Sequence, residues 1–219
     1  MKKFLITFLI TVNVYSQSSN VFKPIDVFDL EYVSNTEISP NGDKILYQRN
    51  YNDIMTDESF SNIWVINFDG SENRPITTGN FKDNSPKWSN KGDKFVFKSN
   101  REGKSQIFLF DLKNNSIQKL TNFQYPIEST QWSPDDDYIL FSSFIDGERD
   151  SLIEMPDKPK GAKWNDPPVE ISDLNYRYDN SGFRKPGEVQ FFTIPANGGT
   201  PRQISNIKPE KTAGQGVWL

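Results

Sequence analysis

The sequence predicts an all-β fold, a partial ring of about three β-propeller blades with four antiparallel strands each. A twelve-residue pattern occurs three times, as 'ISPNGDKILYQR' from residue 38, 'WSNKGDKFVFKS' from residue 88 and 'WSPDDDYILFSS' from residue 132. The copies begin 50 and 44 residues apart, a period typical of propeller blades or helical repeats. No apolar stripe with helical spacing follows the first sixteen residues, so the pattern favours blades.

Each copy predicts the first hairpin of a blade. A strand ends at Ser39, Ser89 or Ser133, and the turns 'PNGD', 'NKGD' and 'PDDD' follow. Proline presets φ, and glycine or aspartate tolerates the left-handed region, so we expect turns centred near residues 41–42, 91–92 and 135–136. The β-branched and aromatic runs 'KILYQ', 'KFVFK' and 'YILFS' come next and predict the second strands.

The second half of the unit also repeats, as 'NIWVINFDGSENRPIT' from residue 62, 'QIFLFDLKNNSIQKLT' from 106 and 'VQFFTIPANGGTPRQIS' from 189. Each reads as an apolar strand, a turn and a short strand, which completes a four-stranded blade. The third strands, over residues 63–66 and 107–110, are nearly all apolar. That composition predicts burial on both faces, between neighbouring blades.

These repeats predict blades over about residues 36–78, 84–122 and 128–205, and the start of a fourth over 206–219, where Trp218 takes the place of Trp88 and Trp132. Trp88 and Trp132 could be ligand platforms, but their fixed place in the repeat favours packing between blades. Blade one has a longer link over residues 48–61, and blade three carries an insertion over 145–188. A connection of that length is usually functional or disordered. Because strands alternate in direction, the insertion should share a face with the links between blades.

The N-terminus predicts a signal peptide over residues 1–16. Lys2 and Lys3 precede an apolar run over residues 4–14, which is too short to span about 30 Å of hydrocarbon. We therefore expect a secreted or periplasmic protein without membrane attachment after cleavage. Residues 17–35 form a lead-in segment, in which 'KPIDVFDL' from residue 23 predicts one or two helical turns.

Composition argues against several other kinds of site. The net charge is −4, with both signs interspersed, so nucleic-acid binding has no electrostatic support. No cofactor or metal site is predicted: carboxylates at Asp135, Asp136 and Asp137 share one turn, where they usually face water, and a hard cation needs about six oxygens from spaced ligands. The same reasoning predicts that Arg101 and Glu102 lie in a solvated link.

The repeats resemble those of TolB-like proteins and of serine peptidases of the prolyl oligopeptidase family. 'DVFDLEYVSNTEISPNGDKILY' and the insertion 'PKGAKWNDPPVEISDLNYRYDNSGF' resemble the acylaminoacyl-peptidase branch more closely, and the resemblance covers residues 28–205. It implies a propeller that precedes a C-terminal α/β-hydrolase domain with a Ser-Asp-His triad. This chain has no histidine and no G-x-S-x-G, so it carries no catalytic residue of the family. We therefore expect an N-terminal fragment that is inactive alone.

Two functions follow from the resemblance. In the first, the chain is the propeller portion of a secreted serine peptidase: it caps the active site and restricts access to small peptides, and the peptide substrate is cleaved by a missing C-terminal catalytic domain. In the second, it is a TolB-like, non-enzymatic binding propeller of the cell envelope. Candidates for a substrate rim are Tyr176, Arg177, Tyr178 and Asp179 in the insertion, where packing that fixes the insertion is the alternative.

An open arc of blades also predicts self-association. Its two terminal faces are expected to carry Ile63, Val65, Phe191 and Ile194, which ring closure would bury. Bare apolar faces of several hundred Å² are association sites, so we expect residues 17–219 alone to be poorly soluble or to form a homo-oligomer.

Overall fold

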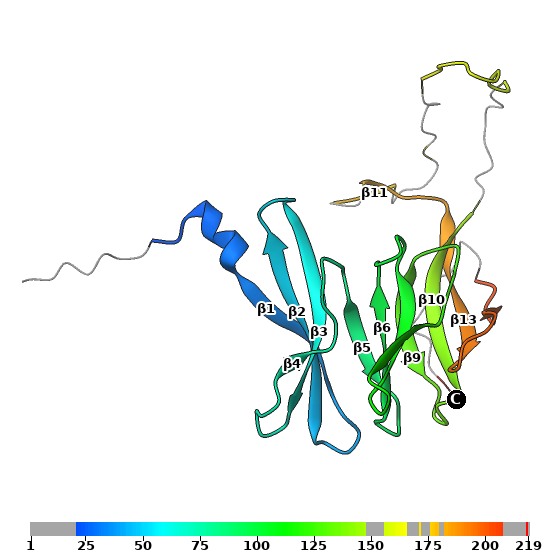
Figure 1. Ribbon diagram of the computed structural model, residues 1–219. Coiled ribbons are helices and arrows are strands. Elements are labelled where there is room, and N and C mark those ends of the chain that lie inside the picture. The colour runs from blue at the N-terminus through cyan, green and yellow to red at the C-terminus, as the bar shows by residue number, and fades with distance from the viewer. Residues whose placement is uncertain are drawn as a thin grey trace, which may run out of the picture.

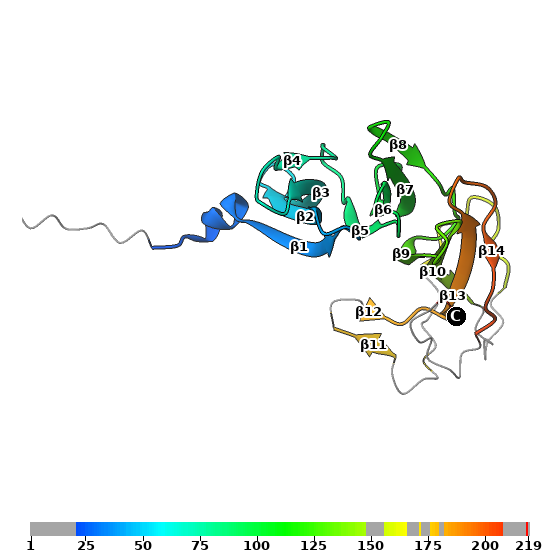
Figure 2. The ribbon, with the colours of Figure 1, turned by 90° about the horizontal axis from the view of Figure 1, so that it is seen from below.

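The computed structural model describes residues 21–147, 156–165, 171, 176–179, 182–207 and 218. Within these residues, three antiparallel four-stranded sheets stand side by side (Figure 1). Figure 2 views them end-on and shows them fanned along an arc, with the first strand of each sheet on the inner side. The predicted all-β, blade-like fold class is confirmed. The proposed signal peptide and most of residues 206–219 lie outside the described residues.

The three sheets follow one another along the chain. Blade one contains β1 (Glu31–Ile38), β2 (Lys44–Asp53), β3 (Glu58–Asn67) and β4 (Arg74–Pro75). Blade two contains β5 (Asn84–Trp88), β6 (Lys94–Ser99), β7 (Gln106–Asp111) and β8 (Ser116–Lys119). Blade three contains β9 (Ile127–Trp132), β10 (Tyr138–Asp146), β13 (Gly187–Pro195) and β14 (Arg202–Gln203). The insertion contributes the two-stranded hairpin β11 (Arg177–Tyr178) and β12 (Gly182–Phe183).

Helix is confined to one short segment among the described residues. The 3₁₀ helix η1 (Pro24–Asp29) occupies the predicted position ahead of β1. Proline stands at its first position, where the missing N–H has no partner to lose. No helix in the described part of the chain is long and apolar enough to cross a membrane.

The first hairpin of every blade has the predicted turn. Positive φ occurs at equivalent positions, with values of 76°, 72° and 63° at Gly42, Gly92 and Asp136. The serine before each turn fixes it from the other side: Ser133 Oγ accepts the N–H of Tyr138 at 2.9 Å, and its counterparts in blades one and two do the same. The turn chemistry of the repeat therefore sets the register between the first two strands.

Two apolar clusters hold the blades together. Between blades one and two lie Leu46, Ile63, Val65, Trp88, Phe95, Phe97, Phe108 and Phe110. Between blades two and three lie Val96, Ile107, Leu109, Leu120, Ile127, Trp132, Ile139, Phe141, Phe192 and Ile194. The predicted packing role of the two tryptophans is confirmed.

The prediction for the terminal faces was largely wrong. Ile63 and Ile194 are fully buried, and Val65 is 7% exposed, because these side chains face blade two from either side. The half-buried side chains of Trp64 and Phe191 point the other way, since strand residues alternate between faces. Burial on both faces of a third strand therefore holds for β7, which has a blade on each side, but not for β3.

The predicted long link over residues 48–61 of blade one was also wrong. Strands β2 and β3 pair without interruption from Lys44 opposite Asn67 to Asp53 opposite Glu58, which leaves a turn of residues 54–57. The polar residues of this stretch alternate with Tyr51 and Phe60, whose rings lie 5.9 Å apart across the hairpin. Cross-strand aromatic pairs of this kind support pairing beyond the core.

Candidate functional site

The insertion leaves blade three through a tight neck. β10 ends at Asp146, β13 begins at Gly187, and Gly147 N–H donates to the carbonyl of Pro186 at 2.9 Å. Gly187 has φ of 137°, and a Cβ there would lie 2.2 Å from the carbonyl oxygen of Ile145. Only glycine fits this position, so the sequence holds the two sides of the insertion together at its base.

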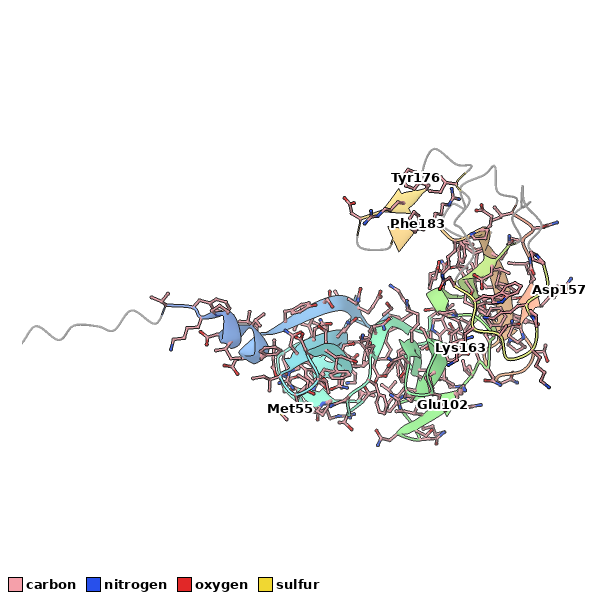
Figure 3. The ribbon with its side chains drawn as sticks, turned by 90° about the horizontal axis from the view of Figure 1, so that it is seen from above. Met55, Glu102, Asp157, Lys163, Tyr176 and Phe183 are labelled. Carbon is pink, nitrogen blue, oxygen red and sulfur yellow. The ribbon has the colours of Figure 1, made fainter. Side chains whose placement is uncertain are left out.

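Beyond the neck, the hairpin β11–β12 presents an aromatic pair. Arg177 pairs with Phe183 in the ladder, and Arg184 N–H donates to the carbonyl of Tyr176 at 2.8 Å. The rings of Tyr176 and Phe183 lie 6.3 Å apart, and the two residues are 45% and 53% exposed. Figure 3 shows both on the hairpin, away from the bodies of the blades.

The hairpin lies on the inner side of the arc, the side of β1, β5 and β9 (Figure 2). In a propeller, the first strands of the blades line the central axis. The insertion therefore carries its aromatic pair across the mouth of the space that these strands border. Of the predicted rim residues, Tyr176, Arg177 and Asp179 are exposed; for Tyr178 only the main chain is described. Their contact with substrate stays a prediction.

Polar contacts of lysine side chains join neighbouring blades near the inner strands. Lys87 on β5 makes an ion pair with Glu37 on β1. Lys98 on β6 donates from its Nζ to the carbonyl oxygen of Glu128 on β9. Burial lowers the pKa of Lys98, and the nearby Glu128 carboxylate opposes that shift. Both contacts join neighbouring blades on the inner side of the arc, where the hairpin β11–β12 also lies (Figure 2).

The sequence predicted that Arg101 lies in a solvated link, and this prediction was wrong. Its guanidinium donates to Oδ2 of Asp83 at 2.8 Å, and Asp83 is fully buried. The guanidinium also lies 5.0 Å from the ring centroid of Phe108, with Phe81 and Phe97 nearby. Asp83 precedes β5 and Arg101 follows β6, so the pair stands on the insertion-bearing face. Glu102 is exposed, as expected, and pairs with Lys119.

The sequence predicted that the carboxylates of this turn face water, and for Asp136 this prediction was wrong. Its carboxylate accepts the main-chain N–H of Asn90 at 2.7 Å and of Lys91 at 3.0 Å. A carboxylate in blade three thus provides the hydrogen-bond acceptor for two main-chain N–H groups in the first turn of blade two. In the described part of the chain, no three His, Cys, Asp or Glu side chains are grouped to hold a metal ion.

The repeats and their geometry match a known domain family. The TolB β-propeller domain matches residues 38–159. The chain belongs to the TolB β-propeller domain family. This match runs from the end of β1 through blade two and into the insertion of blade three.

Curated relatives of this TolB-type propeller are named as peptidases. The uncharacterized peptidase YuxL of Bacillus subtilis is 26% identical over 84% of the chain and 28% of its own length. Dipeptidyl-peptidase 5 of Porphyromonas gingivalis is 27% identical over 68% of the chain and 21% of its own length. The chain spans about a quarter of the length of these relatives.

Solved structures support the fold. An acylaminoacyl peptidase of Pyrococcus horikoshii matches 81% of the chain and 25% of its own length, with a TM-score of 0.59 and 21% identity. This likeness confirms the propeller fold predicted from the sequence. No residue of the chain gains a catalytic role from the likeness.

Proposed function

We propose that this TolB-type propeller is the non-catalytic, substrate-gating portion of a secreted serine peptidase of the prolyl oligopeptidase family. The relatives named as peptidases support a peptidase context. The observation that carries the gating role is the hairpin β11–β12, held on the inner side of the arc by the neck at Gly147 and Gly187.

The gating would work by steric exclusion. A chain approaching along the axis meets an arm that is fixed at its base and ends in the Tyr176–Phe183 pair. A short extended peptide can pass beside such an arm, whereas a folded protein is too wide. Bond cleavage itself falls to residues outside this sequence, because a Ser-His-Asp mechanism needs a histidine and the chain has none.

The same proposal places the protein outside the cytoplasm. The basic start and the short apolar run within residues 1–16 are typical of a cleaved signal peptide. The absence of cysteine means that the fold depends on its core and blade contacts rather than on disulfides.

The gating role is tested in the full-length protein that carries this propeller. Residues 176–183 are replaced by a Gly-Ser linker of equal length, and hydrolysis of a short chromogenic peptide is compared with hydrolysis of a long polypeptide. We expect cleavage of the long substrate to rise and cleavage of the short one to stay unchanged. The control changes Ile54 and Met55, exposed at the β2–β3 turn on the same face, to serine. Unchanged selectivity after hairpin replacement would contradict gating.

A TolB-like binding propeller is the second candidate, favoured by the family match itself. A curated relative named Protein TolB homolog, from Chlamydia abortus, is 26% identical over 54% of the chain and 28% of its own length. This function requires a protein partner in the cell envelope and no hydrolase. Crosslinking in intact cells separates the two: a stable envelope partner without peptidase activity in the purified complex would favour the binding propeller.

A further inference from the structure

A polar cavity of about 600 Å³ opens between blades two and three. It lies where the first-hairpin turns meet the β7–β8 turn, at the opposite end of the blades from the insertion (Figure 1). Blade two contributes Lys94, Ser116 and Gln118, and blade three contributes Asp137, Tyr138 and Ala196. The proposed gating function does not use it.

The repeat provides an internal comparison for this cavity. The equivalent space between blades one and two measures only about 30 Å³. Its walls carry Glu72, Arg74 and Leu112, which the strand registers align with Ser116, Gln118 and Ala196. We use wedge for the space between two neighbouring blades. All three side chains are smaller in the wedge between blades two and three than in the wedge between blades one and two. The opening is therefore a property of these residues, not of blade geometry in general.

Several polar groups of the cavity are unengaged. Within the described residues, the side chains of Ser116, Gln118, Asn197 and Asp137 make no hydrogen bond to the protein. An exposed polar group of this kind is satisfied by water or by a ligand. The cavity thus offers a hydroxyl, two amides and a carboxylate to an incoming molecule.

The charged groups that line the cavity are four carboxylates and two ammonium groups. The Asp136 carboxylate accepts two main-chain N–H groups of the blade-two turn. The Asp111 carboxylate accepts two main-chain N–H groups of its own turn, at 2.9 and 3.1 Å. Asp93 accepts the hydroxyl of Ser89 at 3.1 Å, which leaves Asp137 as the carboxylate without a side-chain partner among the described residues. Hydrogen bonds from neutral groups do not cancel the charge of a carboxylate, so four carboxylates against two ammonium groups leave a formal charge of −2, which disfavours an anionic ligand.

We propose that this wedge binds a hydroxyl-rich ligand of about disaccharide size that carries no negative charge. Hydroxyl groups can both donate and accept, so they can satisfy amides, carboxylates and ammonium groups together. An apolar ligand would leave these groups unpaired. Tyr138, 46% exposed at the rim, provides a flat face for the C–H side of a sugar ring.

Saturation-transfer NMR on the full-length protein that carries this propeller tests the proposal with maltose, cellobiose and N,N′-diacetylchitobiose as probes, and with the neutral tripeptide Gly-Asn-Gly as the competing chemistry. At least one disaccharide is expected to receive saturation. Ala196→Leu with Gln118→Arg installs the residues found in the closed wedge, and is expected to weaken binding by about tenfold or more. The control Gln131→Arg makes a similar change on the exposed inner strand β9.

Circular dichroism verifies that each variant retains its strands before binding is compared. Disaccharide binding that is lost in the filled variant and kept in the control supports the proposal. Three results overturn it: no binding of any disaccharide to the folded chain, binding of the tripeptide instead, or binding that survives filling of the wedge. None of these outcomes depends on peptidase gating.

Discussion

Trp132 donates its indole N–H to the main-chain carbonyl of Lys87 at 2.9 Å. Trp88 makes the corresponding bond to Glu37 at 3.1 Å. Lys87 and Glu37 are the residues just before Trp88 and Ile38, which are the equivalent positions of the preceding blades. Each tryptophan thus packs between two blades and also joins the first strand of its own blade to the first strand of the preceding blade. These two roles explain why the first strand of the repeat ends in tryptophan in blades two and three.

Replacing Trp132 with phenylalanine should destabilise the chain by about 1–2 kcal/mol, because the bond to Lys87 is lost while most of the apolar contact remains. Trp64→Phe is the matched control: Trp64 is half-buried, and its indole has no hydrogen bond among the described residues. Chemical unfolding followed by fluorescence measures both. Equal losses in the two variants would show that ring size, not the inter-blade bond, sets the effect.

Asp136→Asn tests the bond between neighbouring turns. Asparagine tolerates the positive φ of this position, but it keeps only one acceptor oxygen, so its NH2 group faces the main-chain N–H of either Asn90 or Lys91. We expect a loss of about 1–3 kcal/mol in the free energy of unfolding. Asp137→Asn, one residue away and without a side-chain partner among the described residues, should change it by less than about 0.5 kcal/mol. The reverse order would contradict the assigned role.

Arg101→Met should be the most damaging of these changes. It keeps much of the packing against the aromatic rings but leaves the buried Asp83 carboxylate without its partner, which typically costs about 3–5 kcal/mol. The control Lys119→Met removes the more exposed pair with Glu102 and should cost less than about 1 kcal/mol. Urea unfolding curves give both values. A small loss for Arg101→Met would mean that Asp83 is accommodated without the guanidinium.

Asp135 should make the fold sensitive to acid. The hydroxyl of Ser133, at 2.5 Å, and the N–H of Asp137 lower the pKa of Asp135 below its usual value. A carboxyl with a lower pKa in the folded state stabilises the fold above its unfolded pKa, and this contribution is lost as the pH falls through the folded pKa. Between about pH 5 and pH 3, the free energy of unfolding should therefore fall more steeply in the wild type than in Asp135→Asn. Parallel pH profiles would contradict this.

The blades could be predicted because their signals are local. Turn residues, β-branched runs and the spacing of copies all lie within short windows, as at Gly42, Gly92 and Asp136. The face that meets the next blade could not be predicted: Ile63 and Val65 share one side of β3 and Trp64 the other, and the alternation alone does not say which side is covered.

The errors at the candidate sites have a different cause. Arg101 meets Asp83, and Asp136 meets Asn90, only because folding brings separate hairpins together. Each residue alone reads as a charged group in a turn. The polar pattern over residues 48–61 likewise reads as a link, although its cross-strand pairs extend the hairpin. The rings of Phe81, Phe97 and Phe108 likewise surround Arg101 only in the folded chain, so they give no local signal.

The central claim is that this propeller belongs to a serine peptidase but carries none of its catalytic residues. Isolating the native protein with an antibody against residues 31–147, after labelling its source cells with a serine-reactive fluorophosphonate, tests that claim most directly. Mass spectrometry then locates the label. We predict a labelled protein whose modified serine lies outside the 219 residues of this sequence. Label on a serine within these residues, or an isolated protein that takes up no label, would contradict the claim.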